Sequence, residues 1–354
     1  MVLYSFTGGS DGGSPSAALL SDASGALYGT TESGGSNNSG TAFKLVPATA
    51  AAIGTCQVDY NAELGLCGPS APNYTRCINA AAYDLNQCTA YFSNETVLHS
   101  FIGGTADGSN PTAPLISDAS GALYGATANG GTRNHGTIFR LTPHNPANQN
   151  SCQVAYNASV AQCNATYNPT TQCAPTDTVC QGVVNNELST CIGQATTALS
   201  ACTPSPDDET VLYNFASGAS DGSNPTAALV FGASGALYGT TQQGGKSGSG
   251  TVFKLTQSGG NWAETVLYNF TGASDGGNPV SGLLFDASDA LYGTTNSCGA
   301  SNDGTIFKLV PPALSGGSWT ETVLHSFTGS DGAFPFAGLI SDASGALYGN
   351  PNYG

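Results

Sequence analysis

The sequence is poor in charged residues, and cations are the scarcest. Only 8% of its 354 residues are charged, with 7 Lys and Arg against 23 Asp and Glu, for a net charge of -16. Soluble domains usually carry about a quarter charged residues. Binding to nucleic acid or to an anionic lipid surface depends on Lys and Arg. We therefore expect no nucleic-acid partner.

Long apolar runs are also lacking. No stretch reaches the ~18 apolar residues of a membrane-spanning helix, so we expect no membrane insertion. The first residues, Met1–Phe6, have neither the basic start nor the apolar centre of a signal peptide. Eleven Cys and very few Lys nevertheless favour an extracellular or cell-surface protein. We expect either a segment of a longer secreted precursor or a mature chain without its targeting sequence.

What the sequence does contain is a phrase that occurs five times. Its most constant part, Leu-Tyr-Gly, lies at Leu27–Gly29, Leu123–Gly125, Leu237–Gly239, Leu291–Gly293 and Leu347–Gly349. Intrinsic disorder is the alternative for a chain with 48 Gly, but 40% hydrophobic residues in regular short runs argue against it. Internal repetition of this kind predicts a repeat architecture.

Each repeat contains four short runs of apolar residues. A Val-Leu-aromatic run begins at Val2, Val97, Val211, Val266 and Val323. An Asp-Gly turn with a following Pro begins at Asp11, Asp107, Asp221, Asp275 and Asp331. An apolar pair such as Leu339-Ile340 then precedes Ala-Leu-Tyr-Gly. The last run, Gly-Thr-x-Phe-Lys/Arg-Leu, begins at Gly40, Gly136, Gly250 and Gly304.

These runs predict a five-bladed β-propeller of four-stranded blades. Short runs rich in β-branched and aromatic residues, bounded by Gly, Asp, Asn or Pro, are typical of strands. The clean repeat from Val211 to Val266 is 55 residues long, which suits one blade. We place the apolar pair innermost, Leu-Tyr-Gly second, Thr-x-Phe-Lys-Leu third and Val-Leu-aromatic outermost. The N-terminal run Val2–Phe6 and the C-terminal stretch Gly338–Gly349 would then close a fifth blade that lacks its third strand.

Two insertions interrupt the first two repeats, at residues 47–95 and 142–209. They lack strand patterns and are rich in Ala, Gln and Asn. Ten Cys lie in them, and a spacing of 11 residues recurs, which is about three helical turns. The spacing is also palindromic, so we predict two helical hairpins stapled by nested disulfides. The predicted pairs are Cys56–Cys88, Cys67–Cys77, Cys152–Cys202, Cys163–Cys191 and Cys173–Cys180.

Zinc is the competing interpretation of these Cys, but the paired Cys-x2-4-Cys spacing that zinc favours is not present. Small hairpins that bury little core are normally stapled by disulfides. Cys298 lies outside the insertions, in a Gly/Asn/Ser-rich loop, and is either a free thiol or an intermolecular bridge.

No residue pattern indicates a reaction. His99 and His325 occupy the repeat position held elsewhere by Tyr, so we interpret them as framework residues, and His135 and His144 as loop residues. The Asp-Gly turns lack the alternating oxygen ligands of a calcium loop. A second recurrent Asp, at Asp22, Asp118, Asp286 and Asp342, is replaced by Gly232 in the third repeat, as a turn role would permit. We expect no catalytic residue, cofactor or metal, and a non-enzymatic protein.

Six Asn-x-Ser/Thr sequons are candidate glycosylation sites if the host glycosylates. They are at Asn37, Asn73, Asn94, Asn157, Asn164 and Asn269. Three of the six lie on the predicted Cys-rich hairpins.

The repeat, Asp-Gly-x-x-Pro followed by Asp-Ala-x-Gly-x-Leu-Tyr-Gly-Thr-Thr and Gly-Thr-x-Phe-Lys-Leu, resembles the GloVer-type tandem repeat of bacterial surface and secreted proteins. It is also distantly similar to NHL-type propeller blades. The resemblance covers about two thirds of the chain and implies a secreted or surface-anchored propeller of undefined activity.

From these features we expect an extracellular structural or adhesion scaffold. An incomplete fifth blade leaves strand edges unpaired, and proteins rarely leave such edges open. A neighbouring chain or a further repeat would supply the missing strand, and self-association into a surface filament is the strongest form of this hypothesis. The alternative is a secreted propeller that binds or cleaves glycans, which would need carboxylates and aromatic residues at the mouth of the central channel.

Overall fold

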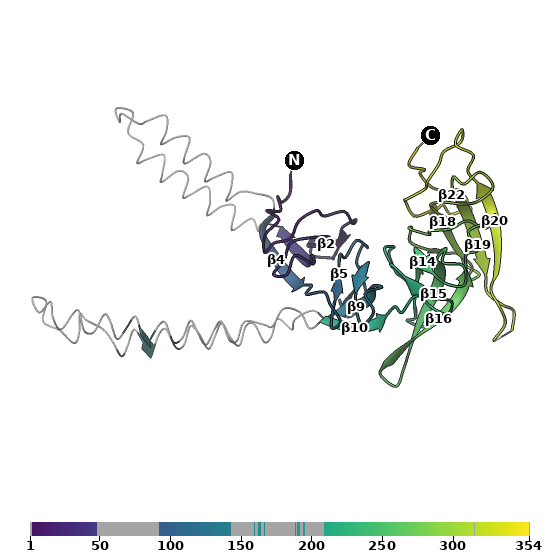
Figure 1. Ribbon diagram of the computed structural model, residues 1–354. Coiled ribbons are helices and arrows are strands. Elements are labelled where there is room, and N and C mark those ends of the chain that lie inside the picture. The colour runs from purple at the N-terminus through teal and green to yellow at the C-terminus, as the bar shows by residue number, and fades with distance from the viewer. Residues whose placement is uncertain are drawn as a thin grey trace, which may run out of the picture. The chain divides into compact units, whose positions relative to one another are not determined.

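The computed structural model describes residues 2–47, 92–142, 209–314 and 316–353, together with eight residues between 159 and 194 (Figure 1). The chain divides into two compact units. One comprises Met1–Leu141 and Glu209–Gly354, and the other comprises Thr142–Asp208. The boundaries at Leu141 and Glu209 are close to those of the predicted second insertion. The strand that follows the first insertion begins at Phe92, slightly before the expected residue 95.

The larger unit is all-β and consists mainly of four-stranded antiparallel sheets, one for each of the first four repeats (Figure 1). The first two sheets contain β1 Leu20–Ser21, β2 Leu27–Thr31, β3 Thr41–Pro47 and β4 Phe92–Ser100, then β6 Ile116–Ser117, β7 Leu123–Thr127, β9 Thr137–Leu141 and β10 Glu209–Asn214. The third and fourth contain β12 Val230–Phe231, β13 Leu237–Thr241, β15 Thr251–Ser258 and β16 Asn261–Asn269, then β17 Leu284–Phe285, β18 Leu291–Thr295, β19 Thr305–Val310 and β20 Thr320–Ser326.

Three two-stranded ladders complete the unit. Two of them are small, β5 Gly108–Ser109 with β8 Asn129–Gly130, and β11 Gly222–Ser223 with β14 Gln243–Gly244. The third, β21 Ile340–Ser341 with β22 Leu347–Tyr348, belongs to the fifth repeat.

Every four-stranded sheet has the strand order that the repeat pattern predicts. The apolar pair hydrogen-bonds to the Leu-Tyr-Gly strand, which pairs with the Phe-Lys/Arg-Leu strand, which pairs in turn with the Val-Leu-aromatic strand. The register is also shared. The Gly of Leu-Tyr-Gly lies opposite the Phe of the third strand, as Gly239 does opposite Phe253. The all-β class, the four-stranded sheets and the order of their strands are therefore confirmed.

The recurrent Asp after the apolar pair forms the predicted hairpin turn. In the first repeat, Asp22 Oδ1 accepts hydrogen bonds from the backbone N–H of Ser24 at 2.8 Å and of Ala26 at 3.0 Å. Tyr28 donates its hydroxyl to Asp22 Oδ2 at 3.0 Å. In the third repeat, where Gly232 replaces the Asp, the backbone bond from Gly232 N–H to the Ala236 carbonyl is kept at 2.8 Å. The turn thus survives without the carboxylate.

The hydrophobic core is divided into clusters that lie between consecutive repeats. The last aromatic residue of one repeat packs edge-on against the third-strand Phe of the next. The ring centroids are 5.0 Å apart for Phe101–Phe139, 5.2 Å for Phe215–Phe253 and 5.1 Å for Phe270–Phe307. Edge-to-face aromatic pairs of this spacing add about 1 kcal/mol to the burial of the rings. Trp262, which lies in β16, packs against one such cluster.

Each third-strand Phe lies directly on the Gly of Leu-Tyr-Gly. A Cβ at Gly125 would approach Phe139 Cζ to 2.5 Å, and one at Gly239 would approach Phe253 Cζ to 2.7 Å. No side chain fits at these distances, so the packing of the Phe requires glycine.

The N-terminal run differs from its predicted conformation. Residues 2–6 form no strand, although an outer strand was expected. An outer strand pairs with a third strand, and among the described residues the fifth repeat pairs only β21 with β22. Phe6 nevertheless packs edge-on against Phe43 at 4.7 Å, the contact that Phe101 makes with Phe139. The segment thus keeps the side-chain packing of an outer strand without its backbone pairing.

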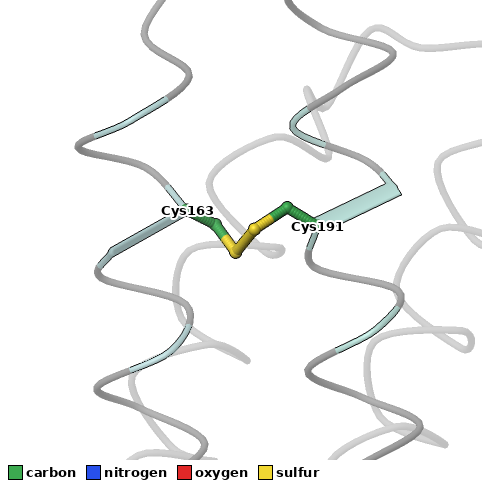
Figure 2. The surroundings of a disulfide bond; sticks show 2 residues. All are labelled: Cys163 and Cys191. Atoms are coloured by element: carbon green, nitrogen blue, oxygen red, sulfur yellow. A yellow bond between two sulfur atoms is a disulfide. The ribbon is translucent and has the colours of Figure 1, made fainter.

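In the smaller unit, the eight described residues are helical. Among them, Cys163 and Cys191 form a disulfide with their Cα atoms 5.8 Å apart (Figure 2). This pair is one of the five that the Cys spacing predicts. The other four pairs lie outside the described residues.

Candidate functional sites

A cluster of polar side chains recurs at the junction between consecutive repeats. The Asp of the Asp-Gly turn accepts a hydrogen bond from a Tyr or His on the segment before it. A Glu on the next outer strand lies near the same Asp. The four clusters are Tyr4–Asp11–Glu95, His99–Asp107–Glu209, Tyr213–Asp221–Glu264 and Tyr268–Asp275–Glu321. We call them the junction clusters.

The Asp is the fixed member of each junction cluster. In the third repeat, Asp221 is 6% exposed. Its Oδ2 accepts the Tyr213 hydroxyl at 3.1 Å and the Ala216 N–H at 2.6 Å, and its Oδ1 accepts the Gly222 N–H at 2.7 Å. These three hydrogen bonds fix the orientation of the carboxylate. The Asp therefore does more than initiate a turn.

The Glu is the unsatisfied member. Glu95, Glu209, Glu264 and Glu321 each have one buried carboxyl oxygen, Oε1, without a hydrogen-bond partner in the part of the chain that the structure describes. Burial, and secondarily the charge of the neighbouring Asp, raises the pKa of Glu264 to about 8 and that of Glu321 to about 7. At neutral pH these junctions thus carry groups poised between a carboxyl and a carboxylate.

The junction between the first two repeats is the only one of the four in which His replaces Tyr. His99 Nε2 lies 3.1 Å from Asp107 Oδ2. The ligand atoms of His99, Asp107 and Glu209 all lie within 4.8 Å of one another. The pKa of Glu209 is raised to about 7, mainly by burial and then by Asp107, while His99 opposes the shift. This arrangement brings together a nitrogen and two carboxylates that are far apart in sequence.

The fifth repeat has only the first half of a junction cluster. His325 Nε2 lies 2.9 Å from Asp331 Oδ2, as in the other repeats. Both side chains are about two-fifths exposed, at 45% and 40%. Among the described residues no Glu faces this pair.

The β22 edge is the second candidate site. In the four complete repeats, the third strand places its Lys or Arg over the ring of the Leu-Tyr-Gly Tyr, at 4.9 to 5.8 Å from the centroid. In the fifth repeat, Tyr348 is 54% exposed and Ile340 is 68% exposed. The Cβ position of Gly349 meets only Leu339 Cδ2, at 2.8 Å, and no aromatic ring. The edge of β22 away from β21, which we call the β22 edge, is thus unpaired at the position where the other repeats have a third strand.

All five repeats contribute to one cavity of about 700 Å³. The residue after the conserved Pro lines it in every repeat: Ser16, Thr112, Thr226, Val280 and Phe336. Apart from Gln242, the lining residues are small, apolar or hydroxyl-bearing, and they include no Asp, Glu or His. Such a lining offers no general acid or base, so it does not favour glycan cleavage there.

The remaining predicted residues are spread over the surface. Asn37 is an exposed turn residue, whereas the side-chain oxygen of Asn269 is engaged by the Lys246 N–H at 3.0 Å. The side chains of Asn73, Asn94, Asn157 and Asn164 lie outside the described structure, as does His144. Cys298 is a free, half-buried thiol, and His135 is a half-buried loop residue away from the junction clusters.

The junction Glu residues escape a sequence reading that looks for isolated carboxylate pairs. Each Glu is distant in sequence from the Asp it faces, by 102 residues for Asp107 and Glu209. The available signal is the recurrence of Glu-Thr-Val-Leu within four outer strands. A surface residue would vary between repeats, so a Glu kept four times indicates a shared contact.

Comparison with known proteins gives one match. Residues 194–354, which include the third, fourth and fifth repeats, match the family model of the Gloeobacter/Verrucomicrobia repeat. No curated protein matches the chain. Among the described residues, no helix is long and apolar enough to cross a membrane.

Proposed function

We propose that this GloVer-type repeat protein is an extracellular scaffold whose molecules join through the β22 edge of the fifth repeat. The five repeats would form a five-bladed propeller with the helical hairpins as insertions. Two observations support the ring. Equivalent residues of all five repeats line one cavity, and Phe6 packs on the first repeat as the final Phe of each repeat packs on the next.

The observation that carries the proposal is the contrast between the fifth repeat and the other four. Tyr124 and Tyr238 are buried, at 7% and 8% exposure, beneath their third strands and neighbouring repeats, whereas Tyr348 is 54% exposed. An edge with apolar side chains and unpaired backbone groups is a template for another strand. Strand addition to such an edge is a common mode of protein association.

The side chains of the fifth repeat define the strand that would fit. A Phe would lie on Gly349, and a cation two-thirds of the way along the strand would lie over the Tyr348 ring, as Lys308 lies over Tyr292 at 4.9 Å. The matching sequence is Gly-Thr-x-Phe-Lys-Leu, the third strand of this repeat. A neighbouring molecule that carries a further copy of the repeat is the partner with this chemistry.

Sedimentation velocity tests whether the molecules associate. Each of the four third strands of this chain is already paired in its own sheet, so the purified chain would associate through the β22 edges of two molecules. We expect this association to grow with concentration and to be lost in Gly349→Ala, whose methyl group would lie where the Phe of a third strand would pack. The unassociated fraction should remain folded, because the nearest atom to that methyl is the flexible end of Leu339. A chain that stays monomeric at all concentrations would contradict the scaffold function.

A further inference from the structure

His99 gives the junction cluster between the first two repeats a metal-binding group that the other three lack. In those three, the corresponding residues Tyr4, Tyr213 and Tyr268 donate a hydroxyl to the Asp at 3.0 to 3.3 Å. A neutral phenol is a poor metal ligand at neutral pH, whereas imidazole offers a nitrogen lone pair. His99 makes the same contact with Asp107 but can also bind a cation.

Three separate segments supply the donor atoms. His99 lies on β4, Asp107 in the following turn, and Glu209 at the first position of β10 in the next repeat. The 3.1 Å between His99 Nε2 and Asp107 Oδ2 is close to the ~3.3 Å that separates two ligands of a tetrahedral ion bound at about 2.0 Å. Since all three ligand atoms lie within 4.8 Å of one another, a small movement of Glu209 would complete the set.

The Asp107 carboxylate is held in place by the backbone. Its Oδ2 also accepts the Ile102 N–H at 2.8 Å, and its Oδ1 accepts the Gly108 N–H at 2.6 Å. Asp107 is 4% exposed. Hydrogen bonds that orient a ligating carboxylate are a usual feature of metal sites.

Glu209 supplies an unused ligand atom, as the Glu of every junction cluster does, and only here does a His lie beside it. Its Oε1 is fully buried and has no hydrogen-bond donor among the described residues. An unpaired buried oxygen beside a second carboxylate is costly, and a divalent cation between them would neutralise both charges. A nitrogen ligand argues against Ca²⁺ and Mg²⁺, which favour oxygen, and one imidazole with two carboxylates suits Zn²⁺.

We propose that His99, Asp107 and Glu209 bind a divalent transition-metal ion of the Zn²⁺ type, which links the first repeat to the second. The ion would replace the His99–Asp107 hydrogen bond with two coordinate bonds and give Glu209 Oε1 a partner. Solvent would fill the remaining coordination position.

The other junctions provide matched variants for the test. His99→Tyr converts the His99–Asp107–Glu209 cluster to the form found at the other three junctions, so the variant should fold. Tyr213→His introduces the same donor set beside Asp221 and Glu264. The full-length chain is stripped with a chelator, dialysed and titrated with Zn²⁺ alone by calorimetry, and Co²⁺ absorption reports the ligand set.

The wild-type chain should bind one Zn²⁺ that His99→Tyr does not bind, with an affinity loss exceeding the ~10- to 100-fold cost of removing a mere outer-shell group. Glu209→Gln, which keeps the shape of the side chain, should also weaken binding, and Tyr213→His should gain a second site. Equal Zn²⁺ binding by the wild type and His99→Tyr, or none by either, would overturn the proposal. Undiminished binding by folded Glu209→Gln would equally overturn it.

Discussion

The junction clusters place two carboxyl groups against each other at every boundary between complete repeats. The adjacent Glu is half-buried, and its pKa is raised first by that burial and second by the nearby Asp. The effect is strongest at Glu264, whose pKa burial and Asp221 raise to about 8. A chain with a net charge of -16 thereby keeps some acidic groups uncharged where its repeats meet.

Glu264 should make folding stability depend on pH. Below pH ~4.5 the Glu is protonated in both the folded and the unfolded chain. As the pH rises to about 8, the unfolded chain ionises first, so the free energy of unfolding falls. Glu264→Gln removes this loss. We expect the variant to match the wild type at pH 4 and to exceed it by about 2 kcal/mol at pH 8.5 in urea unfolding.

The comparison at pH 4 serves as the control, because Gln and protonated Glu are both neutral there. A constant difference between the two proteins from pH 4 to 8.5 would show that Glu264 titrates normally in the folded state.

Each third-strand Phe requires glycine at the Leu-Tyr-Gly position it packs on. Gly349 of the fifth repeat has no such Phe, so glycine is not required there. At Gly239 a methyl group would lie 2.7 Å from Phe253 Cζ, so Gly239→Ala should destabilise the fold by about 2 kcal/mol and lower Tm by roughly 4 to 8 °C. Gly349→Ala meets only the end of Leu339 and should change Tm by less than about 1 °C. Calorimetry of the two variants measures both. Equal losses would mean that the Phe–Gly contact is not what restricts these positions.

The structural role of a single residue could be predicted from the sequence where its contacts lie within its own repeat. Asp22 and its equivalents form the expected turns because the bonds they make span only a few residues. The junction clusters depend on how two repeats pack, and sequence spacing carries no direct information about that contact. The framework interpretation of His99 identified its place in the repeat but not the Glu209 that faces it.

The strands and their order follow from the repeated pattern because antiparallel neighbours joined by short turns have few alternative pairings. Val2–Phe6 shows the limit of that reasoning. Its sequence matches an outer strand, yet a strand needs a partner on the sheet, and only the packing of Phe6 on Phe43 is retained. Local sequence specified its side-chain contacts, whereas backbone pairing depended on another segment.

Helical spacing was informative for the cysteines as well. Cys163 and Cys191 are both helical and joined, as expected if a spacing of 11 residues keeps Cys on one helix face. The disulfide brings together positions 28 residues apart within the smaller unit.

Across the whole molecule, four repeats are nearly identical in structure and the fifth repeat differs from them. Four repeats pair their Leu-Tyr-Gly strand with a third strand, whereas in the fifth repeat that side of β22 has no third strand and Tyr348 is exposed. Solenoid and propeller architectures usually protect such edges. The exposed β22 edge is therefore where we expect this protein to meet its partner.

The most direct test of that account is a titration of the full-length chain with the peptide Gly-Thr-Ile-Phe-Lys-Leu-Val, the sequence of residues 304–310, monitored by the change in Tyr environment and by calorimetry. A control peptide carries Ala in place of Phe. We predict saturable binding of one peptide per chain. The Gly349→Ala variant should not bind this peptide, and the wild-type chain should not bind the control peptide. Failure of the peptide to bind the wild-type chain, or equal binding by Gly349→Ala, would contradict the claim that the β22 edge accepts a third strand.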